Sequence, residues 1–207
     1  MTSFHRYVAL GDSFTEGVGD PDPERPNGLR GWADRFAEAL AVDNPDFGYA
    51  NLAIRGRKLK PILAEQLAPA LALSPDLVTI HAGANDVLRP KVDIDDLMAA
   101  YDDAIAQLRA SGARVVMFTI FDPGPGGIYG PMRGRMAVFN EFVREIAERH
   151  DATIVDMWRM RDVDVSQVFD EDRMHLNAVG HQLIAIAALE ALGIAHDVAP
   201  LPPITRP

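Results

Sequence analysis

Three short segments of the chain carry side chains that together suit nucleophilic catalysis. Ser13 lies in the segment GDSFTEG at residues 11–17, Asn85 lies in GAND at residues 83–86, and Asp172 precedes His175 in DRMH at residues 172–175. A serine hydroxyl attacks a carbonyl carbon when an imidazole removes its proton, and a carboxylate three residues before the histidine can reach Nδ1 and leave Nε2 free for that task. The amide of an asparagine is a neutral donor that suits a developing negative charge.

Each of these segments also has an ordinary structural explanation. A serine after a strand often caps a helix or sits in a turn, and an aspartate three residues before a histidine often belongs to a helix cap. Gly, Asn and Asp are frequent in loops in any protein. A phosphate-binding loop at residues 11–17 would need a GxGxxG or GxxxxGK[ST] pattern, and neither is present. The catalytic interpretation therefore depends on a fold that brings the three segments together.

The pattern of apolar residues predicts such a fold. Short apolar runs typical of strands occur at residues 6–10, 49–54, 77–81, 114–121 and 152–156. Segments with helical spacing follow them at about 31–42, 58–71, 94–110, 132–150 and 177–192, and Asp93 is placed to cap the third of these helices. Runs such as Val115 to Phe118 are apolar on both faces, which favours a parallel sheet covered by helices on both sides. The expected fold class is α/β, a three-layer α/β/α sandwich.

In an open parallel sheet, ligands bind outside the carboxyl ends of the strands. Ser13 follows the first predicted strand, Gly56 follows the second and Asn85 follows the third. A glycine lets the backbone approach a ligand closely and offers its N–H, so Gly56 and Asn85 are candidates for an oxyanion hole. Serine, oxyanion donors and an Asp172/His175 pair at one sheet edge favour a hydrolase.

At this point the sequence resembles the SGNH or GDSL hydrolases, a family of esterases and lipases. Its blocks occur in order from about Tyr7 to Leu192: GDSF at residues 11–14 with Phe14 in place of the usual leucine, then Gly56, GAND and DRMH. The resemblance implies Ser13 as nucleophile, His175 as general base and acid, and Asp172 as the residue that orients it. It implies the Ser13 N–H, the Gly56 N–H and the Asn85 side chain as oxyanion donors. It also implies a flavodoxin-like sheet of about five parallel strands and no metal.

The expected function is a serine esterase or acylhydrolase that cleaves small carboxylic esters through an acyl-enzyme on Ser13. We expect short acyl groups because no lid-sized insertion or long exposed apolar helix appears in the sequence. The alternative is a flavodoxin-like protein that binds a nucleotide or a carbohydrate without catalysis. Sugar esters, thioesters and lipids all remain open as substrates, and no cofactor is expected.

Composition sets limits on partners and location. The 207 residues include 30 acidic residues against 20 Lys and Arg, a formal charge of −10 that disfavours nucleic acid as a partner. The absence of cysteine excludes disulfides and thiolate chemistry. No apolar run reaches the length of a membrane helix, and the first one is too short for a signal peptide, so we expect a cytoplasmic protein without stable membrane insertion. The oligomeric state is left open.

Several other residues carry expectations that the structure can test. Asp12, Thr15 and Asp86 are expected to hydrogen-bond the loops around the site, and His81 is expected to be a core histidine with its hydrogen bonds satisfied. Trp32 and Tyr129 are candidates for the acyl pocket, with core packing as an equal explanation for Trp32. The remaining histidines lack metal-ligand spacing. These are His5, His150, His181 and His196.

Three segments are predicted to lie at the periphery of the fold. The Gly- and Pro-rich stretch at residues 122–131 is expected to be a long loop at the functional rim or a mobile flap. Four basic residues flank Gly56, and a solvated helix start explains them better than an anion-binding site. They are Arg55, Arg57, Lys58 and Lys60. Residues 1–194 are predicted to form a single domain, and residues 195–207, with four prolines, an extended tail outside it.

Overall fold

A parallel sheet organises the chain. The structure is a computed structural model that describes residues 4–42, 44–161 and 163–204. Within these residues the strands are β1 (Arg6–Gly11), β2 (Gly48–Asn51), β3 (Leu77–His81), β4 (Arg114–Phe118) and β5 (Thr153–Val155). All neighbouring strands are parallel and lie in the order β2-β1-β3-β4-β5. Because β1 has β2 on one side and β3 on the other, the connections diverge beyond its carboxyl end, where such sheets bind ligands.

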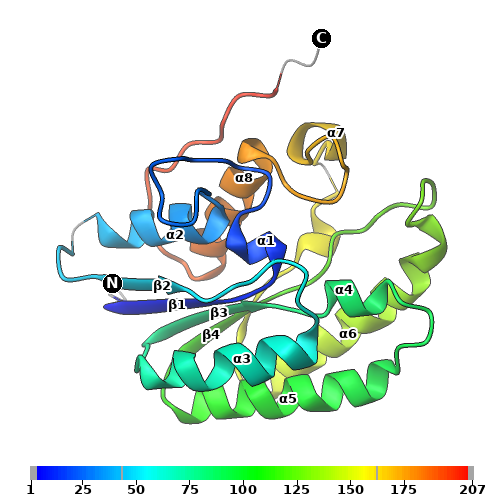
Figure 1. Cartoon of the computed structure of the whole chain (residues 1–207), viewed down its shortest axis with the longest axis horizontal. Coiled ribbons are helices and arrows are strands. Elements are labelled where there is room, and N and C mark those ends of the chain that lie inside the picture. Colours follow the sequence, from blue (N-terminus) through cyan, green and yellow to red (C-terminus); the bar gives the residue numbers. More distant parts are fainter. Residues whose placement is uncertain (1–3, 43, 162, 205–207) are drawn as a thin grey trace.

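Helices cover both faces of the sheet, because successive side chains of each strand point to opposite faces. Tyr7 and Ala9 of β1 pack toward α2 (Trp32–Ala41) and α8 (Ala178–Ala191). Val8 and Leu10 pack toward α3 (Leu59–Ala72), α5 (Ile94–Ala110) and α6 (Arg133–Arg149). Figure 1 shows α2 and α8 above the sheet and α3 and α5 below it. The predicted three-layer α/β/α class is confirmed, with five parallel strands in the flavodoxin-like order.

The long helices begin and end within one residue of their predicted bounds, and α5 has the bounds that were predicted. The Asp93 side chain caps α5 by accepting a hydrogen bond from the Asp96 N–H at 3.2 Å, as expected. Strands β2 and β4 end earlier than predicted, and an asparagine side chain binds the backbone just beyond the end of each. The Asn51 Oδ1 accepts from the Ala53 N–H and turns the chain after β2. Beyond β4, the Asn140 side chain accepts from the Ile120 N–H and donates to the Ile120 carbonyl.

The loops at the carboxyl edge contain short helical turns that were not predicted. They are α1 (Ser13–Glu16), α4 (Ala84–Val87) and α7 (Val165–Val168), with 3₁₀ turns η1 (Gly130–Met132) and η2 (Met157–Arg159). Four-residue helices have too few residues to show a periodic apolar stripe, so the apolar pattern does not reveal them.

Beyond α8 the chain runs across the surface without helix or strand as far as residue 204. Its contacts tie it to the helical layer above the sheet. The Ala199 carbonyl accepts a hydrogen bond from the Gln182 Nε2 at 2.7 Å, and Val198 packs against the core beneath α2 and α8. No helix in the described part of the chain has the length and apolar character needed to cross a membrane.

Candidate active site

The end of β1 is shaped to present Ser13. Gly11 has a φ of +156°, and a Cβ there would lie 2.5 Å from the Thr15 Oγ1 and 2.7 Å from the His81 carbonyl oxygen, so a side chain is excluded. The buried Gln66 amide clamps the same residue, accepting from the Gly11 N–H at 2.8 Å and donating to the Gly11 carbonyl at 2.9 Å. Asp12 then caps α1, with its Oδ1 accepting from the Phe14 N–H at 3.2 Å. Ser13 is thus the first residue of a helix at the carboxyl edge of the sheet.

Ser13 meets His175 across the fold. The distance between the His175 Nε2 and the Ser13 Oγ is 3.1 Å, although the residues are 162 positions apart. The His175 Nδ1 lies 2.6 Å from the Asp172 Oδ2. In the tautomer with a proton on Nδ1, His175 donates to Asp172, and its Nε2 accepts the Ser13 hydroxyl proton. The structure therefore brings together the three side chains that the sequence singled out as nucleophile, base and orienting acid.

The turn that carries His175 is held by its own backbone bonds. The Asp172 Oδ1 accepts from the Met174 N–H at 2.8 Å and from the His175 N–H at 2.9 Å. The Asp170 N–H donates to the His175 carbonyl at 2.8 Å. Partial burial raises the pKa of the Asp172 carboxyl, but these N–H donors and the His175 ring outweigh it, so the pKa lies below its usual value. The lowered pKa favours the ionised carboxylate beside the His175 imidazole.

Asn85 lies beside Ser13, and its amide is already engaged. The Asn85 Nδ2 donates to the Asp12 Oδ2 and to the Arg57 carbonyl, each at 3.0 Å. Gly83, the cap residue of α4, has a φ of +98°, and a Cβ there would lie 2.7 Å from the Phe139 ring. This packing sets where α4 starts and so places Asn85 at the pocket. With both amide hydrogens occupied, Asn85 must share one of them with any oxyanion that it stabilises.

Gly56 is held next to this group without lining the pocket itself. On one side, the Arg55 N–H donates to the Glu16 Oε2 of α1 at 2.6 Å, and on the other, the Arg57 carbonyl accepts from Asn85. Gly56 is exposed and has a φ of +75°, which glycine adopts without strain. In the described part of the chain, the N–H groups of Ser13 and Gly56 have no hydrogen-bond acceptor. Both donors are therefore available to a ligand.

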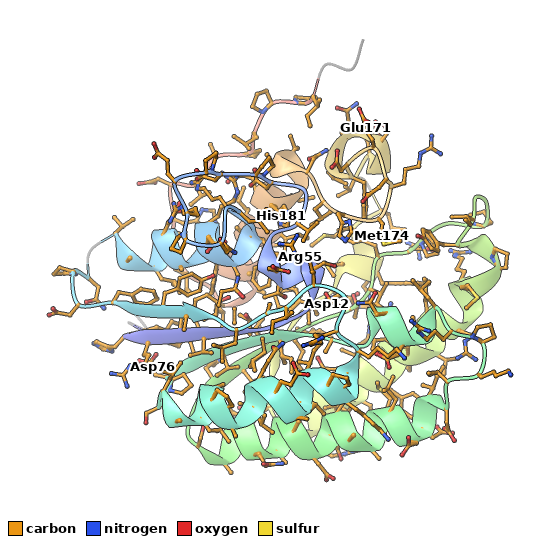
Figure 2. The ribbon with its side chains drawn as sticks, in the orientation of Figure 1. Asp12, Arg55, Asp76, Glu171, Met174 and His181 are labelled. Atoms are coloured by element: carbon orange, nitrogen blue, oxygen red, sulfur yellow. The ribbon has the colours of Figure 1, made fainter. Side chains whose placement is uncertain are left out.

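A pocket of about 310 Å³ opens over Ser13, and its lining joins the candidate catalytic residues to an apolar wall. Ser13, Asn85 and His175 line it, and Tyr129 does so as predicted. The wall includes Ile120, Phe121, Ile128, Met136, Met157, Phe169 and Met174. Residues of the 122–131 loop form one side, which confirms its predicted place at the rim. Trp32 is fully buried in the core against Phe118, so core packing explains it. Figure 2 shows Asp12 at this end of the sheet and Asp76 at the opposite end.

Several expectations about the supporting residues need correction. His81 is buried, but its Nδ1 has no hydrogen-bond partner in the described residues and lies 3.8 Å from the Asp12 Oδ1, so it is not satisfied. The Thr15 Oγ1 also has no partner there, because Thr15 packs against Gly11 instead. Asp12 and Asp86 do hold loops, as predicted, and the Asp86 Oδ2 accepts from the Leu59 N–H at 2.8 Å at the start of α3.

Sequence reasoning missed the roles of Gln66 and His181. Both lie on helices with largely apolar sequences. Only the packed fold shows which backbone groups their side chains contact. Three residues of the basic cluster are in ion pairs: Arg55 with Glu16, Arg57 with Glu65 and Lys60 with Asp96. That pairing supports the solvated helix start. Across the described residues, no group of three or more His, Asp or Glu side chains is placed to hold a metal ion.

Known proteins share both the sequence pattern and the fold. The family model of the GDSL-like lipase/acylhydrolase family matches residues 9–183. An acetylxylan esterase of Geobacillus stearothermophilus is 25% identical over 209 residues, covering 92% of this chain and 95% of that protein. The uncharacterised protein YpmR of Bacillus subtilis is 22% identical over 211 residues, covering 89% and 80%.

Solved structures extend this likeness to three dimensions. LAE5, an alpha/beta hydrolase enzyme from the metagenome of Lake Arreo, superposes with a TM-score of 0.77 at 25% identity, covering 93% of this chain and 97% of that one. The crystal structure of the Geobacillus esterase superposes with a TM-score of 0.75 at 23% identity, covering 92% and 95%. Catalytic mutants of that esterase replace a serine, an aspartate and a histidine by alanine. From the family match over most of its length, we conclude that the chain belongs to the GDSL-like lipase/acylhydrolase family and is a serine esterase.

Proposed function

We propose that this esterase cleaves small carboxylic esters through an acyl-enzyme on Ser13. The contact that carries the proposal is the 3.1 Å approach of the His175 Nε2 to the Ser13 Oγ, with Asp172 on the other ring nitrogen. Nucleophile, base and orienting carboxylate within hydrogen-bond reach are what acyl transfer through a serine requires. The carboxylate stabilises the imidazolium that forms as the proton moves.

The reaction proceeds in two halves. His175 takes the hydroxyl proton as the Ser13 Oγ bonds to the ester carbonyl carbon, and the tetrahedral intermediate collapses as His175 returns that proton to the leaving alkoxide. A water then attacks the acyl-enzyme, giving its proton to His175, and the carboxylic acid leaves as the Ser13 Oγ regains a proton. The oxyanion of both intermediates is assigned to the free N–H groups of Ser13 and Gly56 and to the Asn85 amide.

Short acyl groups fit this pocket best. Its volume of about 310 Å³ lies at the low end of the range of small-molecule sites, which runs from roughly 300 to 1,000 Å³. The pocket must hold parts of both the acid and the alcohol, which leaves little room for a long chain. The acetylxylan esterase relative acts on an acetylated carbohydrate by its name, so acetyl esters are the first substrates to test.

A pre-steady-state burst tests the proposal. Mixed with p-nitrophenyl acetate, the wild-type enzyme should release about one equivalent of p-nitrophenol rapidly if deacylation is the slower half. Ser13→Ala should abolish both burst and turnover while the unfolding curve stays unchanged, and p-nitrophenyl esters of rising chain length should show falling kcat/KM. Ser111→Ala, which alters the serine at the C-terminal end of α5, is the matched control. Turnover that survives in Ser13→Ala would reject the acyl-enzyme, and a total lack of hydrolysis would favour the non-catalytic binding protein.

A further inference from the structure

Arg173 stands in the turn between Asp172 and His175 and is one of the residues that line the pocket. We propose that Arg173 binds an anionic group, a carboxylate or a sulfonate-like oxyanion, on the alcohol part of the ester. This inference rests on the proposed function, because it assigns the substrate class of that same site. It makes Arg173 a specificity-determining residue for charged esters.

The guanidinium of Arg173 is uncommitted. Among the described residues, no hydrogen-bond acceptor or acidic partner contacts this side chain, whereas Arg25, Arg55, Arg133 and Arg144 are all in ion pairs. The carboxylates and imidazoles that line the pocket have neighbours: Asp12 contacts Asn85, His81 faces Asp12, Asp122 pairs with Arg133, and His175 contacts Ser13. An exposed arginine without a partner at a pocket is available for a planar anion.

The backbone holds Arg173 in a costly conformation. Its φ is +55°, in the left-handed region that is strained for a residue with a long side chain. The Arg173 N–H donates to the Asp170 carbonyl at 3.0 Å, and the next two N–H groups donate to Asp172. The turn that carries His175 therefore also fixes the backbone position from which the Arg173 side chain starts.

The mechanism decides which half of the ester meets Arg173. His175 returns its proton to the leaving oxygen, so the alcohol must lie on the side of the pocket where the His175 ring stands. Arg173 and Met174 immediately precede His175 and belong to the same side. The apolar residues Ile120, which follows β4, and Met136 of α6 also line the pocket. An anion held by Arg173 is therefore attached to the alcohol, and the acyl group faces the apolar wall.

The charges around the pocket mouth support an anion despite the net charge of −10. Across the pocket, Asp122 is held by Arg133 at 2.6 Å and by Arg161 at 3.1 Å, so two cations outweigh one carboxylate there. Asp170 and Glu171 lie on the same loop as Arg173 but do not line the pocket. In Figure 2, Glu171 stands at the outer end of this loop, and Met174 lies nearer to Asp12. The electrostatic attraction of an anionic substrate group is therefore confined to the mouth of the pocket.

Matched acetate esters test the assignment. The substrates are 4-acetoxybenzoate and 4-acetoxybenzenesulfonate as the two anionic arms and methyl 4-acetoxybenzoate as the neutral one. Arg173→Gln should lower the anionic-to-neutral ratio of kcat/KM by about three- to tenfold, as expected for an exposed charge-assisted pair, and the neutral ester corrects for any general change in activity. Arg173→Lys should retain most of the ratio. The carboxylate and sulfonate arms show which oxyanion geometry is preferred.

Two controls separate this contact from general charge effects. Arg114→Gln removes the same charge at the amino end of β4, far from the pocket, and should leave the ratio unchanged. Raising NaCl from about 0.01 to about 1 M shortens the Debye length from about 30 to about 3 Å, and should lower the ratio in the wild type but not in Arg173→Gln. An equal ratio in wild type and Arg173→Gln would overturn the inference. Hydrolysis of the neutral ester by Ser13→Ala would instead overturn the proposed function, so the two failures are distinct.

Discussion

At the scale of single residues, each proposed catalytic side chain is held by a small number of hydrogen bonds. Asp172 uses one oxygen for the His175 ring and the other for two backbone N–H groups, so the orienting acid and the turn are one structure. Asn85 is likewise shared between Asp12 and the Arg57 carbonyl. Each contact is short range, so single substitutions separate their contributions.

Asn85→Ala tests the oxyanion donor. Removal of one donor of this kind costs about 10² to 10³ in kcat, or roughly 2.7 to 4 kcal/mol, because the interaction strengthens as charge develops on the oxygen. KM for p-nitrophenyl acetate should change little, since the neutral carbonyl gains less from the same donor. Steady-state kinetics measure both, with Asn44→Ala at the other end of the sheet as control. Unchanged kcat in Asn85→Ala would remove Asn85 from the oxyanion hole.

Asp12→Asn tests whether Asp12 is the residue that positions Asn85. A hydrogen bond to a charged group contributes about 1.5 to 3 kcal/mol, so its loss should lower kcat about 10- to 100-fold. The expected sign of a positioning role is that Asp12→Asn adds little to the defect of Asn85→Ala in the double variant. Defects that multiply would show that Asp12 acts independently of Asn85.

At the scale of elements, one buried histidine joins three segments that frame the site. The His181 Nδ1 on α8 accepts from the Trp32 N–H at the start of α2 at 3.1 Å, and its Nε2 lies 3.2 Å from the Val18 carbonyl after α1. The following Gly19 packs so closely that a Cβ would lie 2.0 Å from the Leu176 carbonyl oxygen beside His175. Neutral His181 is required for this arrangement, because a proton on Nδ1 would break the bond from Trp32.

Burial lowers the pKa of His181 to about 4, with the nearby Arg35 and His175 acting in the same direction and Asp20 and the Val18 carbonyl opposing them. The unfolded chain binds this proton below a pKa of about 6.5, so folding is favoured less as the pH falls from about 6.5 to 4. This group alone should remove on the order of 3 kcal/mol of unfolding free energy across that range.

Urea unfolding at several pH values measures this slope. His181→Gln should be less stable than wild type at pH 7 and should show a shallower fall of unfolding free energy between about pH 6.5 and 4. His5→Gln removes an exposed histidine at the amino end of β1 and should keep the wild-type slope. A slope that stays the same in His181→Gln would assign the acid sensitivity to other groups.

At the scale of the whole molecule, a chain of polar contacts runs from the terminal segment to the loop beside the site. Ala199 accepts from Gln182, Gln182 accepts from Arg35 at 3.0 Å, and Arg35 pairs with Asp20 at 2.5 Å. Arg35 and Asp20 are buried, so each depends on the next for its partner. The terminal segment therefore contributes to the packing of α8 against α2.

Deletion of residues 195–207 should lower the unfolding free energy by about 1 to 3 kcal/mol, because the Gln182 Nε2 loses its acceptor and Val198 no longer packs. Since none of the described residues 195–204 lines the active pocket, kcat/KM for p-nitrophenyl acetate should stay within about twofold of wild type at temperatures where both proteins are folded. Urea unfolding and steady-state kinetics check the two halves. A large loss of activity in a fully folded variant would mean that the polar chain positions the catalytic groups.

Much of the fold followed from local rules. Apolar periodicity is a local property, so the alternation of strands and helices and the ends of the long helices were predictable from the sequence. The ends of β2 and β4 were not, because the apolar pattern continues past both strands and does not reveal the bonds that Asn51 and Asn140 make to the backbone beyond them. The turns at α1 and α4 were also missed, although the residues within them, Ser13 and Asn85, were identified.

The sequence by itself determined which residue types stand at the strand ends and in what order. The chemistry that a serine, a histidine and a carboxylate can perform follows from these identities and their spacing. Only the tertiary structure decided that Ser13 and His175 touch, that Asn85 is shared with Asp12, and that Arg173 is one of the residues that line the pocket. The physical reason is that such contacts join residues far apart in the chain. Their distances follow from the register and twist of a packed sheet, which no local pattern specifies.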